Sequence, residues 1–175
     1  MPQYKKRKKY TPKKFESDGS PSDTSANIYV SMIHSRAWNE LTARQKTLYL
    51  YCKIQYYDEK RKPVKYEDRN KPKSLTKSEY PEHNRTWFTL NQFKWYEKYR
   101  LYTNKNSFYT DIEALIMHGF IFCVECGSYT IVENDKTTYA STIYAFSDKW
   151  QKYGTSDFEI TLSEMTNAMK KKHKK

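Results

Sequence analysis

Apolar residues recur at helical spacing in the second half of the chain and predict one well-defined helix there. They stand at i, i+4, i+7 and i+8, as a single buried helix face requires: Phe108, Ile112, Leu115 and Ile116. Gly119 follows directly, and glycine is the residue that most readily adopts the left-handed conformation of a helix C-terminal cap. The apolar run 120–124 then predicts a strand. The order predicted for this segment is helix, tight stop and strand.

A helix is also predicted after Leu41, where the sequence has the spacing of a capping box. Thr42 and Gln45 stand three residues apart, so the hydroxyl can bond forward while the amide reaches back. Apolar and aromatic residues then fall on one face of this helix: Leu48, Tyr49, Cys52 and Tyr56. Trp38 and Leu41 just ahead predict a short helical turn.

The same capping-box spacing recurs further along and predicts a second helix. Thr89 and Gln92 form the box, and three aromatic residues make its inward face: Phe93, Tyr96 and Tyr99. A tight polar turn separates this helix from the third, whose start is capped by either Thr103 or Asn104. Three capped helices, the last two separated by a tight turn, have the spacing of a helix-turn-helix.

Strands are predicted where apolar residues alternate or form short runs. Ile28 and Val30 alternate and predict a short strand, and the pair 87–88 predicts another. A β-hairpin follows the third helix, with a turn-rich tip at 134–138 and three strand segments: 120–125, 129–132 and 141–146.

The net charge of the chain is concentrated at its two ends. The sequence holds 32 Lys and Arg against 20 Asp and Glu, a net charge of +12. Seven cations lie within residues 1–14 and five lysines within 170–175, in both cases without an acid, so the body 15–169 is neutral. We expect these ends to be solvated, disordered tails that neutralise phosphates and release counterions. The alternatives are a solubility tail or a nuclear-import signal.

Composition narrows the class of protein further. Seventeen Tyr, eight Phe and four Trp supply apolar bulk, and only four glycines argue against glycine-rich phosphate loops. No apolar run approaches the roughly 20 residues needed to span a membrane, and the basic N-terminus lacks the apolar core of a secretion signal. The three cysteines, an odd number, are typical of a reducing compartment. We therefore expect a cytoplasmic protein without a membrane partner.

The predicted organisation has one folded domain between two tails. Residues 1–26 form the basic N-terminal tail, and 27–153 form the folded domain. Within it, 58–85 is dense in charge and contains three prolines, which predicts a long loop or insertion. A C-terminal helix is predicted over 154–169 and a lysine tail over 170–175.

These elements together predict an α+β fold, a winged helix-turn-helix with a three-helix core and a β-hairpin wing. Their order, with the unit 101–121 and a last strand Ile143-Tyr144-Ala145-Phe146, resembles the winged-helix domain of Gram-positive plasmid replication initiators of the RepA_N type. More loosely, it is similar to winged-helix regulators such as the MarR group. The segment 35–51, with Trp38, Leu41 and Gln45, also resembles small DNA-binding proteins of plasmids and integrative conjugative elements.

The resemblance implies sequence-specific binding of double-stranded DNA by a plasmid or mobile-element protein. Its role would be in replication initiation or as an accessory factor at an origin, including a conjugative transfer origin. A winged-helix transcriptional regulator is the alternative, and a protein-interaction or RNA-binding module or an unrecognised enzyme is a third possibility. The implied partners are duplex DNA, a second copy in a homodimer, and replication or relaxosome proteins. We expect no enzyme activity, no cofactor and a location with the nucleoid or plasmid.

The helical wheel of the third helix indicates which residues would contact DNA. With the apolar stripe inward, Asn106, Ser107 and Thr110 point outward near the helix start and are candidates to read base edges. Lys105 and Tyr109 lie beside them and suit phosphates, as does Asn104 at the helix N-terminus. Further contacts are predicted from the wing and the N-terminal tail: Lys136, Thr137 and Thr138, and Lys5, Lys6, Arg7, Lys8 and Lys9.

Metal and redox chemistry are not predicted. Cys123 and Cys126 form a lone CxxC on the wing strand, whereas a zinc site needs about four ligands and a redox motif usually precedes a helix. The four histidines have no paired spacing of the kind that a metal-dependent nicking site uses. Tyr129 and Tyr144 could stack single-stranded bases, but the helix pattern favours duplex DNA.

Overall fold

Helices open the part of the chain that the structure describes. This structure is a computed structural model, and it describes residues 26–60, 87–90, 100–127, 129–132, 136–139 and 141–173. Helices α1 (Val30–Ile33) and α2 (Arg36–Glu40) are short, and α3 (Ala43–Lys60) is the longest described. The backbone N–H of Thr42 donates to Oε1 of Gln45 at 2.8 Å, and that of Gln45 donates to Oγ1 of Thr42 at 3.3 Å. The predicted capping box is confirmed.

Helix α1 replaces the short strand predicted from the alternation of Ile28 and Val30. The Tyr29 carbonyl accepts the backbone N–H groups of Met32 at 3.0 Å and Ile33 at 3.2 Å, which closes a helical turn. Met32 is buried in the core and holds this turn in place. The strand prediction was wrong because two alternating residues are a weak signal, and local backbone bonds satisfy the segment without a partner strand.

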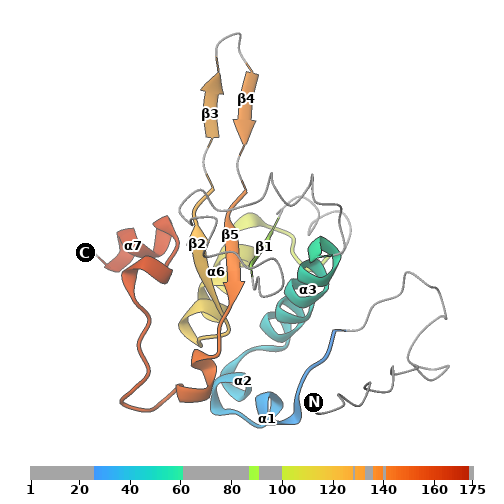
Figure 1. Cartoon of the computed structure of the whole chain (residues 1–175), viewed down its shortest axis with the longest axis vertical. Helices are drawn as coiled ribbons and strands as arrows, with labels where there is room; N and C mark the ends of the chain where they lie inside the picture. Colours follow the sequence, from blue (N-terminus) through green and yellow to red (C-terminus); the bar gives the residue numbers. More distant parts are fainter. Residues whose placement is uncertain are drawn as a thin grey trace, which may run out of the picture.

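The central sheet has three antiparallel strands in the order β1-β5-β2. It contains β1 (Trp87–Thr89), β2 (Ile121–Glu125) and β5 (Ile143–Phe146), and Tyr144 of β5 pairs with Phe88 on one side and Cys123 on the other. A separate ladder of β3 (Tyr129–Val132) and β4 (Lys136–Tyr139) projects beyond the other elements as a hairpin (Figure 1). The α+β class and the predicted strands of the hairpin are confirmed.

Helix α6 (Lys105–Met117) packs against α3 and β2, and its predicted apolar stripe is buried as a set. An aromatic cluster joins it to the rest of the core. The Phe120 ring lies 5.8 Å from Trp38, 5.2 Å from Tyr49 and 6.1 Å from Trp150, measured between ring centroids. Aromatic residues therefore fill the space between the helices and the sheet, as the composition indicated.

Helix α6 ends in a Schellman motif centred on Gly119. The backbone N–H of Phe120 donates to the Leu115 carbonyl at 3.0 Å, and that of Gly119 donates to the Ile116 carbonyl at 2.9 Å. Gly119 has a φ of +75°, the left-handed conformation that the sequence predicted for this position. The motif turns the chain directly into β2, so β2 runs back along α6 in the opposite direction.

The C-terminal region differs from the predicted helix over 154–169 and lysine tail over 170–175. A 3₁₀ turn η2 (Lys149–Lys152) and a second, η3 (Leu162–Glu164), precede helix α7 (Asn167–His173), which includes the first lysines of the expected tail. Met165 and Met169, four residues apart, are buried in the core and anchor α7. Positive charge at a helix C-terminus is favoured by the helix dipole, so these lysines suit the end of α7.

Several predictions fall outside the described residues. They concern the N-terminal tail with Lys5, Lys6, Arg7, Lys8 and Lys9, the predicted second helix beyond Leu90, residues 134–135 of the predicted hairpin tip, and residues 174–175. Most of the segment 58–85 also lies outside, but α3 continues to Lys60 and so includes its first residues. Among the described helices, none combines the length and the apolar character needed to cross a membrane.

Candidate nucleic-acid interface

The candidate site begins at the N-terminus of α6, where Asn104 is the cap. Asn104 has extended backbone geometry, and its Oδ1 accepts the backbone N–H of Ser107 at 2.8 Å. The structure thereby decides between Thr103 and Asn104, which the sequence left open. The side-chain oxygen of Asn104 is engaged in the cap, so its structural contribution is to fix the first turn of α6.

Replacing Asn104 with alanine should lower the free energy of unfolding by about 1 kcal/mol, because one N-terminal backbone donor loses its partner. Urea unfolding followed by circular dichroism measures this change. Thr103→Ala is the matched control, since Thr103 is exposed one residue earlier and is not the cap residue. A loss of equal size in both variants would contradict the role assigned to Asn104.

Three of the predicted contact residues share the exposed face of α6. Lys105, Asn106 and Thr110 are exposed, whereas Ser107 and Tyr109 are partly buried at the margins of this face. The Lys105 Nζ lies 5.6 Å from the centre of the Tyr109 ring, a cation–π contact that orients the lysine. The face therefore presents an amide, a hydroxyl and an ammonium group next to the capped start of the helix.

Asp111 anchors the opposite side of α6 to the rest of the core. Its carboxylate is buried and accepts bonds from Arg44 Nε at 2.5 Å, Gln45 Nε2 at 3.2 Å and Tyr102 Oη at 2.8 Å. Burial and the bond to Asp111 both raise the pKa of Tyr102, so its hydroxyl stays protonated and donates. The bond to Asp111 also raises the pKa of Arg44. These four residues, which we call the Asp111 cluster, fix α6 against α3 on the side away from the exposed face.

The sequence analysis did not select Asp111, Arg44 or Tyr102 as a cluster. A signal was present, because Asp111 lies next to the apolar stripe of a predicted helix, where a charged residue needs partners. Gln45 is 66 residues from Asp111, Arg44 is 67 residues away and Tyr102 is 9 residues away. The spacing in the sequence therefore does not indicate that these residues meet.

Helix α7 adds positive charge beside α6. Lys172 Nζ binds Glu113 Oε2 at 2.6 Å, and Glu113 lies beside Asn106 at the margin of the outward side of the α6 wheel. The acid on this face is thus paired with a lysine from the C-terminal helix. Lys170 and Lys171 continue the positive charge along α7. These basic residues were predicted as a tail, but the structure places them on a helix next to the candidate face.

The hairpin lies at the same end of the molecule as the start of α6. Because β2 runs opposite to α6 from the Gly119 turn, the end of β2 lies alongside the first turns of α6. A helix of this length spans about 20 Å and β2 about 17 Å, so the two ends nearly coincide. The hairpin β3–β4 continues from that end (Figure 1).

Three residues that were predicted at the tip of the hairpin belong instead to strand β4: Lys136, Thr137 and Thr138. They pair with Val132, Ile131 and Thr130 respectively. The prediction placed the turn too late because Lys and Thr at the tip are compatible with either turn or strand, and threonine favours the strand. Their backbone positions lie along the projecting hairpin.

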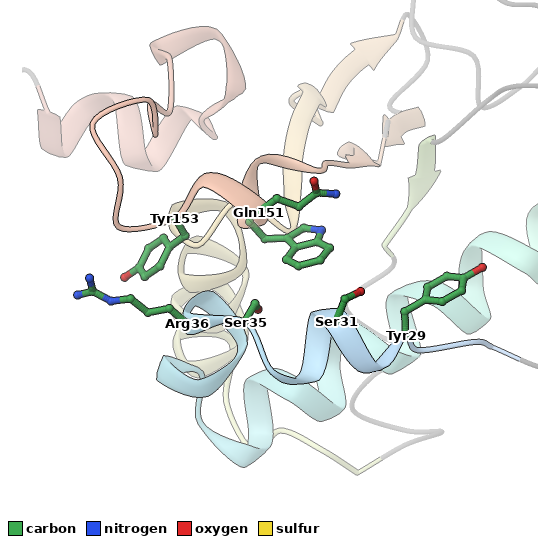
Figure 2. A pocket seen from close by; sticks show the side chains of 7 residues that line it. Tyr29, Ser31, Ser35, Arg36, Gln151 and Tyr153 are labelled. Carbon is green, nitrogen blue, oxygen red and sulfur yellow. The ribbon is translucent and has the colours of Figure 1, made fainter.

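A second candidate is an open hollow of about 630 Å³ between α1, α2 and η2 (Figure 2). Its lining includes Tyr29, Arg36 and Tyr153. Arg36 Nε donates to Glu40 at 2.8 Å, and Tyr153 Oη donates to Glu40 at 2.7 Å. These two polar groups are therefore engaged with Glu40, which does not line the hollow. The face of α6 presents an amide, a hydroxyl and an ammonium group together on one capped helix and is the stronger candidate.

The described residues contain no group of three or more His, Cys, Asp or Glu side chains arranged to hold a metal ion. Comparison with known protein families, with curated proteins and with solved structures finds no match for this chain. The case for a function therefore depends on the geometry of the molecule itself.

Proposed function

We propose that the protein binds duplex DNA in a sequence-specific manner through a winged helix-turn-helix. In this proposal α6 is the recognition helix and the β3–β4 hairpin is the wing. The support is the element order α3, β1, α6, β2, hairpin, β5, together with a three-stranded antiparallel sheet whose last two strands carry the hairpin. A helix inserted in the major groove reads bases with its N-terminal residues while neighbouring elements contact the backbone.

The observation that carries the proposal is that the capped start of α6 is exposed, while the other side of the same helix is fixed to the core. Asn106 and Thr110 are exposed one turn apart, and the Asp111 cluster holds the other side of the same helix. Amide side chains bind adenine edges in the major groove, and threonine offers both a hydroxyl and a methyl group. A site held on a rigid element can present these groups in one orientation.

The charge distribution supports binding to the phosphate backbone. Lys105 lies at the helix start, and α7 carries three consecutive lysines, Lys170 to Lys172, of which Lys172 contacts Glu113 of α6. Lys172 also neutralises Glu113, which would otherwise repel a phosphate. Lysines that displace counterions from DNA supply affinity that is independent of sequence and falls steeply with salt.

The resemblance to plasmid initiators and to small proteins of conjugative elements gives the proposal its biological setting. We propose a plasmid or mobile-element protein that acts in replication initiation or as an accessory factor at an origin. A transcriptional regulator would have the same site geometry. Mapping the preferred binding sequence to an origin or to a promoter on the source DNA distinguishes the two roles.

The test of DNA reading is selection from a random duplex pool with the full chain at about 0.15 M salt, where non-specific binding has weakened. We expect one motif to be enriched. Asn106→Ala and Thr110→Ala should each weaken binding to that motif by about 1–3 kcal/mol, roughly 5- to 150-fold. Asn39→Ala is the matched control, since Asn39 is exposed on α2 at the end away from the hairpin.

Enrichment of a motif whose affinity does not change in the Asn106 and Thr110 variants would exclude α6 as the reading helix. Binding of the full chain without any enriched motif would reduce the proposal to non-specific phosphate contact. Binding to single-stranded or RNA pools in preference to duplex DNA would favour the third class of function instead.

A separate prediction concerns α7. Lys172→Ala should weaken binding to all sequences alike and reduce the slope of log affinity against log salt by about one. The loss should be partly restored in the double variant Lys172→Ala/Glu113→Gln, which removes the acid that Lys172 had neutralised. Lys152→Ala in η2 serves as the control and should leave the slope unchanged. Equal slopes for the Lys172 and Lys152 variants would exclude α7 from the interface.

A further inference from the structure

Two thiols meet at the point where β2 leads into the hairpin. The Sγ atoms of Cys123 and Cys126 are 3.5 Å apart. In a regular strand, residues three apart point to opposite faces of the sheet. The register of β2 against β5 shifts between Cys123 and Glu125, and this β-bulge reverses the alternation so that both sulfurs lie on one side. The sequence pattern alone did not predict this meeting.

The two thiols differ in their access to solvent. Cys123 is buried, and Cys126 is only partly buried at the end of the strand. Burial, and to a smaller extent the adjacent Cys126, raise the pKa of the Cys123 thiol to about 12, although Lys170 of α7 lowers it. Cys52 is fully buried in the core, and its burial raises its pKa as well. Cys126 is therefore the accessible thiol, and Cys123 is its nearest described partner.

We propose that Cys123 and Cys126 form a modification site, a dithiol that small-molecule disulfides such as glutathione disulfide oxidise reversibly. The Cys126 thiolate attacks one sulfur of the oxidant, forms a mixed disulfide and releases one glutathione thiolate, which takes up a proton. Cys123 then loses its proton, attacks the Cys126 sulfur and expels the second glutathione. The two protein thiols lose two electrons and two protons, and the oxidant gains them.

The new disulfide bond would restrict the backbone at the base of the hairpin, where β2 leads into β3. Cys126 and Gly127 lie between β2 and β3, at the base of the hairpin. Two described contacts cross this base: Glu125 pairs with Ile143, and the Gly127 N–H donates to Thr142 Oγ1 at 3.0 Å. A protein disulfide requires the sulfurs to approach to about 2.05 Å, so a shift of roughly 1.5 Å is needed. The hairpin strands pair with each other and not with the central sheet, so a covalent tie at their base restricts their movement.

The test is oxidation of the full chain in glutathione buffers of increasing disulfide content, followed by acid quench, alkylation and intact mass. We expect a loss of about two mass units and two fewer alkylated cysteines, with the Cys123–Cys126 bond located by peptide mapping. Cys123→Ser should stop at the mixed disulfide on Cys126, and Cys126→Ser should remain unmodified. Reduction with dithiothreitol should restore all three thiols.

A stable mixed disulfide on the unaltered chain, a dimer linked through Cys126, or no reaction would each overturn the proposal. The effect on the hairpin is measured by amide hydrogen exchange, which should slow in β3 and β4 on oxidation, but not in the Cys123→Ser variant. Exchange that is equal in both oxidation states would exclude a link between the dithiol and the hairpin. None of these readouts involves DNA, so the result is independent of the proposed function.

Discussion

Replacing Asp111 with alanine is expected to lower the free energy of unfolding by about 2–4 kcal/mol, since several bonds to one buried carboxylate are lost together. The Tyr102 hydroxyl is buried and would lose its partner, whereas Arg44 has a side chain that is 47 % exposed and can turn to water. Urea unfolding at neutral pH measures the change. Because Asp111 joins α6 to α3, the same variant should also weaken binding to any motif selected by the full chain.

Two further variants divide this loss among the partners. Tyr102→Phe removes one neutral donor and should cost about 1 kcal/mol. Arg44→Ala should cost about 1–3 kcal/mol, because solvent screens the half-exposed guanidinium, but its removal leaves the buried Asp111 carboxylate without a positive partner. If Arg44→Ala cost less than Tyr102→Phe, the buried carboxylate would not need its positive partner, and the argument from its burial would fail.

Replacing Gly119 with alanine should lower the free energy of unfolding by about 2–4 kcal/mol, through backbone strain and overpacking together. The residue has a φ of +75°, and an added Cβ would lie 2.7 Å from the Trp150 backbone nitrogen and 2.8 Å from the Lys149 carbonyl carbon. These are backbone atoms that also hold the bond from the Trp150 N–H to the Gly119 carbonyl at 3.0 Å. Neither can move without disturbing η2.

Gly154→Ala provides the matched comparison for Gly119. Its φ of +81° is similar, but the added Cβ would meet the end of the Arg36 side chain, which can rotate away. We therefore expect a cost of only about 1 kcal/mol, the lower range for a non-glycine residue in this conformation. Equal losses at both glycines would show that backbone strain alone decides the effect and that the contact with η2 adds nothing.

Several features that depend on residues close in sequence were predictable. The Thr42–Gln45 capping box, the Gly119 stop and the apolar stripe of α6 each follow from bonds or packing within a few residues. Local patterns determine where such elements begin and end, because the partners always lie at a fixed spacing. The strand at 87–88 was equally well marked by two large aromatic residues.

Features that depend on tertiary contacts were not predictable. Helix α7 exists because Met165 and Met169 enter the core, although its lysines look like a solvated tail in isolation. The pairing of Lys172 with Glu113 spans 59 residues, and the bulge that joins Cys123 to Cys126 depends on the register against β5. The charge and spacing of these residues in the sequence do not indicate that they are close in space.

The candidate site was predicted in part. The helical wheel correctly separated the exposed Lys105, Asn106 and Thr110 from the buried stripe, because burial on α6 follows its periodicity. It could not assign Asn104 to the cap over Thr103, nor place the basic residues of α7 beside the face. The reading of DNA by these residues stays a prediction until binding is measured.

Within the described residues, the order β1-β5-β2 leaves the central sheet with two edge strands, each of which has backbone groups that could pair with a strand from another molecule. β1 is only three residues long, and η3 lies against β2. Short or covered edges are common means by which proteins prevent aggregation through strand addition. This sheet therefore resists growth into a polymer through strand addition.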